Sequence, residues 1–164
     1  MIKIAPSILA ADLINVKDEV ELVDKNGAEY IHIDIMDGHY VPNITFGPNI
    51  VKSLRPITNK VLDVHLMISP VAKYIKNFID AGADIISFHP DADDNPFDII
   101  EVIKNNKCKA GIALHPNIKV SDIIKHLASV IPTVLQILVL LIIPFFINFK
   151  LTFYTIIISL LVAA

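Results

Sequence analysis

Strand and helix signals alternate along most of this 164-residue chain. Short apolar runs predict strands over residues 2–9, 29–36, 60–67, 84–89 and 109–114. Helical spacing and capping residues predict helices over residues 13–23, 47–55, 69–79, from 95 onward and over 121–127. The segments Asn26-Gly27-Ala28-Glu29 and Asp80-Ala81-Gly82-Ala83-Asp84 both lead from a helix into the next strand, so a βα unit recurs. Five such units predict a parallel sheet with helices outside it.

Polar residues mark the C-terminal ends of the first three predicted strands. Parallel strands covered on both faces are usually apolar throughout, but Ser7, Asp34 and His65 depart from this pattern. In a (β/α)₈ barrel the C-terminal ends of the strands carry the functional site. A complete barrel needs roughly 200 residues or more. The chain is therefore expected to be an incomplete barrel of about five or six βα units.

The second and third strands repeat one arrangement of side chains. Successive side chains of a strand point to opposite faces. Each strand therefore places a histidine, an aspartate and a methionine on one face: His32, Asp34 and Met36 in one, and Asp63, His65 and Met67 in the other. Neighbouring strands of this kind would bring imidazoles and carboxylates together. The pattern predicts a metal-binding site that also holds a base.

Charge is distributed unevenly along the chain. Residues 1–130 contain all 17 acidic residues, all six histidines and all but one of the 14 basic residues, so this part is mildly acidic. It has no basic patch typical of nucleic-acid binding. Cys108 is the single cysteine, which excludes an internal disulfide and fits a reducing compartment. No signal peptide is recognised at the start, and a cytoplasmic location is expected.

Residues 131–164 form an apolar tail whose only charged residue is Lys150. Residues 131–149 are uncharged and long enough for a membrane helix, which needs about 20 residues. Pro132 and Pro144 interrupt that segment, and its Ile, Phe and Val content equally favours a strand, such as Thr133 to Leu141. A divergent or frame-shifted tail, a membrane anchor and a buried completion of the core all stay open. We expect the domain boundary near residue 130.

Three motifs, in order, give the chain a family resemblance. They are Ala5-Pro6-Ser7-Ile8-Leu9, the run from Ile31 to Asn43 (IHIDIMDGHYVPN), and Asp63-Val64-His65-Leu66-Met67. From the first residue to about Val130 the chain closely resembles the ribulose-phosphate 3-epimerase family. The resemblance implies an incomplete (β/α)₈ TIM barrel of the α/β class. It also implies an isomerase of the pentose phosphate pathway that interconverts D-ribulose 5-phosphate and D-xylulose 5-phosphate.

The resemblance also implies roles for individual residues. His32, Asp34 and His65 correspond to three of the family's four ligands to one divalent metal ion. Asp34 would also be a catalytic acid/base residue. The residues expected to contact substrate or line the face of an enediolate are Ser7, His65, Met36 and Met67. Zinc, iron(II), manganese(II) and cobalt(II) all suit such ligands, so the identity of the metal stays open.

The expected chemistry explains these residue types. Epimerisation next to a ketone removes a proton and returns one to the opposite face, and a carboxylate can do one half of this work. A divalent metal stabilises the enediolate oxygens as a Lewis acid. The family places its second carboxylate and its glycine-rich phosphate loops on late strands, whereas this chain has no acidic residue after Asp122 and no glycine after Gly111. We therefore expect an impaired enzyme that exchanges a proton without completing the inversion.

Several alternatives remain from the sequence. A related ketose-phosphate epimerase, acting for example on allulose 6-phosphate, shares the early motifs, and a non-catalytic truncated or membrane-tethered remnant is the rival outside catalysis. A homo-oligomer is expected if a full barrel forms. Among single residues, Asp63 lies deeper in the sheet than His65, and we expect it to support the ligands rather than bind the metal. His89 and His115 end later strands and could face the site, but they are not included in the predicted ligand set.

Overall fold

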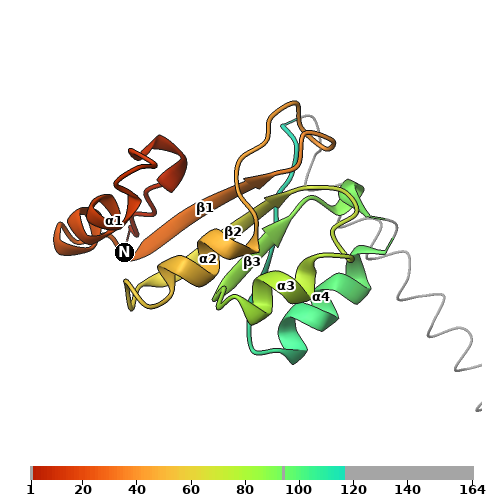
Figure 1. Ribbon diagram of the computed structural model, residues 1–164. Helices are drawn as coiled ribbons and strands as arrows, with labels where there is room; N and C mark the ends of the chain where they lie inside the picture. Colours follow the sequence, from red (N-terminus) through yellow and green to blue (C-terminus); the bar gives the residue numbers. More distant parts are fainter. Residues whose placement is uncertain (1, 94, 117–164) are drawn as a thin grey trace, which may run out of the picture. The chain divides into compact units, whose positions relative to one another are not determined.

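The computed structural model describes residues 2–93 and 95–116, and Met1–His115 form one compact unit. The described strands form a parallel sheet in the order β1-β2-β3-β4 (Figure 1). The strands are β1 (Tyr30–Met36), β2 (Val61–Met67), β3 (Ile85–Phe88) and β4 (Lys109–Ile112). The helices are α1 (Val16–Lys25), α2 (Pro48–Leu54), α3 (Ile75–Asp80) and α4 (Pro96–Asn105), with the 3₁₀ turns η1 (Ile8–Ala10) and η2 (Pro90–Ala92). The predicted α/β class is confirmed.

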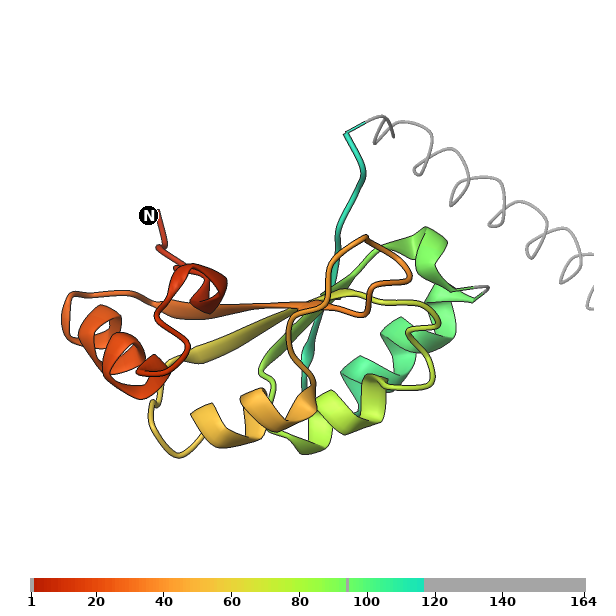
Figure 2. The ribbon, with the colours of Figure 1, turned by 45° about the horizontal axis from the view of Figure 1, so that its top comes forward.

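Strands β1 and β2 each have one apolar face and one face that carries their histidine and aspartate. Burial alternates along β1 and β2, and the buried side chains are Ile31, Ile33, Ile35, Leu62, Val64 and Leu66. Helices α2, α3 and α4 lie together on one side of the sheet (Figures 1 and 2). The buried side chains pack in one core with residues of these helices, among them Val51, Leu54 and Phe78. Because side chains alternate, the histidines and aspartates of β1 and β2 lie on the opposite face.

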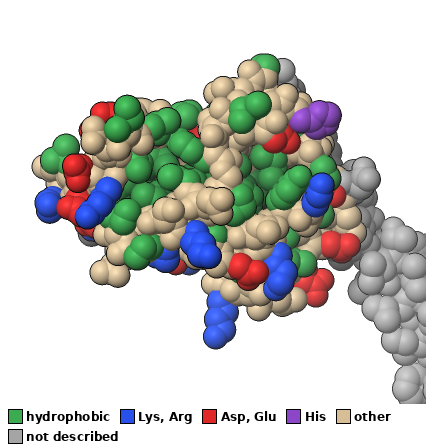
Figure 3. Space-filling view, in the orientation of Figure 1, with side chains coloured by type: hydrophobic (Ala, Val, Ile, Leu, Met, Phe, Trp, Pro, Cys, Tyr) green, Lys and Arg blue, Asp and Glu red, His purple; other side chains and the backbone are tan. Residues whose placement is uncertain are grey.

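The outer surface of the helical layer is polar. In Figure 3, Lys, Arg, Asp and Glu side chains are spread over α2, α3 and α4, whereas apolar side chains are visible between α1 and α2. This distribution is typical of helices that bury one face against a sheet. None of the helices in residues 2–93 and 95–116 is long and apolar enough to cross a membrane.

Two predicted helix boundaries are confirmed by their caps. Helix α1 ends at Lys25, and Gly27 follows at φ +93°, a conformation that glycine adopts without steric cost. Helix α4 begins after Asn95, whose side chain accepts a hydrogen bond from the backbone N–H of Asp98. Pro96 occupies the first turn of α4, where a missing N–H costs nothing.

The strand predicted over residues 2–9 is wrong. The chain instead passes β1 as an extended segment and turns into η1, with a single bridge between Ser7 and His32. The carbonyl of Pro6 accepts from the N–H of His32 at 2.9 Å, but Pro6 itself has no N–H with which to continue a ladder. Ile2 and Ile4 are exposed.

The helix start predicted at Ser69-Pro70 is also wrong, because α3 begins at Ile75. Ser69 does not cap a helix. Its N–H donates to Asp37 Oδ2 at 2.9 Å, and its hydroxyl donates to the carbonyl of Ala92 at 3.0 Å. Ser69 therefore ties together the loops that follow β1, β2 and β3. The helix predicted over 121–127, the domain boundary near 130 and the apolar tail lie outside the described residues and stay predictions.

Candidate metal centre

The register of β1 and β2 brings together the three predicted metal ligands. Asp34 lies opposite His65 in the parallel pair, and His32 lies two residues before Asp34 on the same face. Asp34 Oδ1 is 3.2 Å from His32 Nε2 and 3.3 Å from His65 Nδ1. One donor atom from each residue lies within 4.8 Å of the others. All three side chains are partly buried.

These separations fit a shared cation. Zinc binds imidazole nitrogen and carboxylate oxygen at about 2.1 Å, and two such bonds at a tetrahedral angle place the ligand atoms about 3.4 Å apart. The separations of 3.2 and 3.3 Å therefore suit one ion between the three residues. Two imidazoles and one carboxylate are also a common donor set for a catalytic divalent metal with open positions.

Two further side chains fix this arrangement. Asp63 Oδ2 is 2.8 Å from His32 Nδ1, which leaves Nε2 of the ring facing Asp34. The hydroxyl of Ser7 donates to Asp34 Oδ2 at 2.7 Å, so the two oxygens of Asp34 have different partners. Asp63 therefore bonds the ring of His32, one of the predicted ligands, and its supporting role stays a prediction. Carboxylates that bond the distal nitrogen of a metal-binding histidine orient the ring and raise its basicity.

The environment favours an ionised Asp34. Burial works to raise its pKa, but the hydrogen bond from Ser7 and the neighbouring His32 and His65 outweigh burial and hold the pKa below its usual value. The hydrogen bond to Asp63 raises the pKa of His32. Burial lowers the pKa of His65, which favours the neutral imidazole that a metal requires.

Comparison with known proteins places the chain in a family. The model of the ribulose-phosphate 3 epimerase family matches residues 3–146. The chain belongs to this family. It is 51% identical over 126 residues to the ribulose-phosphate 3-epimerase of Bacillus subtilis (strain 168), covering 77% of this chain and 58% of that protein. It is 45% identical over 114 residues to the ribulose-phosphate 3-epimerase of Escherichia coli (strain K12), covering 69% and 51%.

The chain thus spans about half the length of the curated relatives it matches. A solved structure described as Yersinia pestis DHPS with a pterine-sulfa conjugate is similar with a TM-score of 0.54 at 14% identity, covering 77% of this chain and 50% of that one. This likeness concerns the fold alone. With the family established, the parallel sheet and its alternating helices are part of a TIM barrel, as predicted.

The remaining predicted residues of this epimerase-family chain lie at the same end of the sheet. Met36 and Met67 are the last residues of β1 and β2, are partly buried and pair in register. Thr45 was not predicted from the sequence. Its hydroxyl donates to the carbonyl of Asp34 at 2.6 Å and accepts from the N–H of Met36 at 3.0 Å. Thr45 therefore holds the loop after β1 against the strand end.

A second group of side chains lies beside His65 and was not included in the predicted site. His65 Nε2 is 3.2 Å from His89 Nε2, and the rings of His89 and His115 stack at 4.6 Å. Tyr40, from the loop after β1, places its hydroxyl 3.0 Å from Asp91 Oδ1 and 2.7 Å from His115 Nε2. Burial raises the pKa of Tyr40 to about 12, with Asp91 adding to the effect. The sequence does indicate two of these residues, because His89 directly follows β3 and His115 closely follows β4, at the end of the sheet where the site lies.

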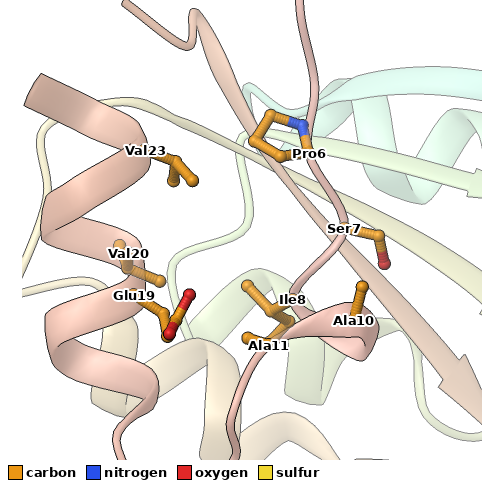
Figure 4. A pocket seen from close by; sticks show the side chains of 8 residues that line it. All are labelled: Pro6, Ser7, Ile8, Ala10, Ala11, Glu19, Val20 and Val23. Atoms are coloured by element: carbon orange, nitrogen blue, oxygen red, sulfur yellow. The ribbon is translucent and has the colours of Figure 1, made fainter. Parts of the chain in front are cut away.

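A cavity of about 180 Å³ lies away from these ligands, between η1 and α1 (Figure 4). Val20 and Val23 of α1 face Pro6 and Ile8 across it, and Glu19 is the charged residue among its described lining. Ser7 borders the cavity, but its hydroxyl bonds Asp34. The cavity is therefore apolar in character and does not contain the metal-ligand group.

Proposed function

We propose that this chain carries the metal-and-base half of a ribulose-phosphate 3-epimerase site, acting on D-ribulose 5-phosphate or D-xylulose 5-phosphate. The observation that supports this most directly is the convergence of His32, Asp34 and His65, with Asp34 and His65 toward the C-terminal ends of β1 and β2 and His32 two residues before Asp34. This is the end of the strands at which TIM-barrel enzymes place their catalytic residues.

Asp34 is the base in this proposal. Its lowered pKa keeps the carboxylate ionised near neutral pH. The carboxylate takes the proton from C3 of the substrate, and the electrons of the C3–H bond move toward the C2 carbonyl oxygen to give an enediolate. Ser7 bonds Oδ2, so its hydroxyl fixes the direction in which Asp34 approaches the substrate. In this proposal Ser7 and His65 also contact the sugar oxygens.

His32, Asp34 and His65 would hold one divalent cation: zinc, iron(II), manganese(II) or cobalt(II). When bound, the cation supplies Lewis-acid stabilisation for the negative charge on the enediolate oxygens. Asp63 keeps His32 oriented for this role through the 2.8 Å contact with Nδ1. Met36 and Met67 end the same two strands and offer thioethers, which pack against a planar intermediate without protonating it.

The proposed activity of the 164-residue chain is partial. Return of a proton to the opposite face needs a second acid, and the sequence has no acidic residue after Asp122. Asp34 alone exchanges the C3 proton with solvent on one face. A related substrate such as allulose 6-phosphate presents the same carbon to Asp34, so the same exchange is expected there. The lone Cys108 is consistent with activity in the reducing cytoplasm.

Deuterium exchange at C3 tests this proposal. The chain is loaded with one divalent metal and incubated with ribulose 5-phosphate in D₂O. Exchange is followed by NMR, and xylulose 5-phosphate is measured in parallel with a coupled assay. We expect slow exchange without detectable inversion. Asp34→Asn should abolish exchange, because the amide cannot accept the proton.

Asp18→Asn provides the matched control, because Asp18 lies in the exposed first turn of α1. This variant should exchange the C3 proton at the rate of the unmodified chain. Exchange that survives Asp34→Asn, or is lost equally in Asp18→Asn, would contradict the assignment of Asp34. Net formation of xylulose 5-phosphate would show that a second acid operates and that the activity is complete.

A further inference from the structure

Three donor side chains lie together at the C-terminal ends of β3 and β4, outside the group formed by His32, Asp34 and His65. We call His89, Asp91 and His115 the mouth cluster. One donor atom from each lies within 4.8 Å of the others, and His115 Nε2 is 3.6 Å from Asp91 Oδ2. Two imidazoles and a carboxylate repeat the donor set of the first group.

His89 supplies an independent reason to expect a ligand here. The residue is 8% exposed, and its Nδ1 is fully buried with no hydrogen-bond partner among the described residues. Its Nε2 is already engaged with His65 at 3.2 Å. Buried ring nitrogens are nearly always hydrogen-bonded or bound to a metal, since a buried polar group without a partner loses its hydration uncompensated.

The remaining contacts hold the mouth cluster in place. The hydroxyl of Tyr40 donates to Asp91 Oδ1 at 3.0 Å and lies 2.7 Å from His115 Nε2. The ring of Tyr40 also lies 5.3 Å from that of His89. Tyr40 therefore touches all three members and orients Asp91, as residues behind metal ligands commonly do.

We propose that the mouth cluster binds a second divalent cation of the zinc type, through His89, Asp91 and His115. Three protein ligands leave an open position for water or for an anionic oxygen. The ion is distinct from the one proposed between β1 and β2, and His65 and His89 connect the two groups. This inference does not depend on the proposed epimerase activity.

Zinc stoichiometry tests the proposal. The full chain is dialysed against zinc alone, and bound metal is counted by mass spectrometry. We expect two ions per chain, one in His115→Ala, one in Asp34→Asn and almost none in the double variant. His39→Ala is the control, because His39 is an exposed loop histidine, and it should keep both ions. Asp91→Asn preserves side-chain shape and should behave like His115→Ala, which guards against a folding defect.

Tyr40→Phe separates a supporting residue from a ligand. It should keep both ions but weaken binding of the second by about 10–100-fold, the usual effect of removing a group behind a ligand. The proposal is overturned if the unmodified chain binds one ion and both His115→Ala and Asp91→Asn still bind one ion. The mouth cluster is then a hydrogen-bonded network only. If one ion is bound and His115→Ala removes it, the mouth site stands and the site between β1 and β2 fails.

Discussion

Asp63 raises the pKa of His32, although Asp63 is not itself one of the proposed ligands. Its Oδ2 lies 2.8 Å from His32 Nδ1, and this bond is the main reason why the pKa of His32 is raised. Asp63 is predictable from the sequence, because it shares a face with His65 and the parallel register places it beside His32. The partner of each nitrogen is not predictable, since it depends on side-chain rotation within the sheet.

The raised pKa of His32 predicts a pH dependence of metal binding. A cation must displace the proton from Nε2, so affinity is weak while His32 is protonated, rises with pH and levels off above the raised pKa. Asp63→Asn removes the charge that raises this pKa and should move the rise to lower pH. Zinc affinity measured against pH, in a His115→Ala chain that lacks the mouth site, checks this. An unchanged profile in Asp63→Asn would show that Asp63 does not act through His32.

At the scale of elements, the sequence predicts those helix and strand features that depend on neighbouring residues. The period-two alternation of β1 and β2 and the cap of α4 are read directly from neighbouring residues, and the structure confirms them. The start of α3 was mispredicted because Ser69 bonds Asp37 and Ala92, which are 32 and 23 residues away. No local pattern records such partners.

The cap of α4 gives a stability prediction. Asn95 bonds both the N–H and the carboxylate of Asp98, so Asn95→Ala should destabilise the fold by about 1 kcal/mol and lower the melting temperature. Asn49→Ala is the control, because Asn49 is an exposed residue within α2 and should change stability much less. Equal melting temperatures for the two variants would show that α4 does not depend on its cap.

At the scale of the whole described unit, the pairing of strands in the sheet brings residues that are distant in the sequence close together. The convergence of His32, Asp34 and His65 could be predicted because adjacent parallel strands in register set their separation. For the mouth cluster the sequence indicates only that His89 and His115 follow strands. The contacts of Tyr40 with Asp91 and His115 span 51 and 75 residues of chain, through loops whose paths the sequence does not reveal. The predictable part of the site is therefore carried by strands, and the unpredicted part by loops.

The measurement that most directly tests the account is the coupling of His32 and Asp34 in zinc binding. In a His115→Ala background, His32→Gln and Asp34→Asn should each weaken affinity at least about a hundredfold. The double variant should lose much less than the product of the two effects, because both residues bind one ion. Unchanged affinity in both single variants, or losses that simply multiply, would contradict a shared cation between β1 and β2.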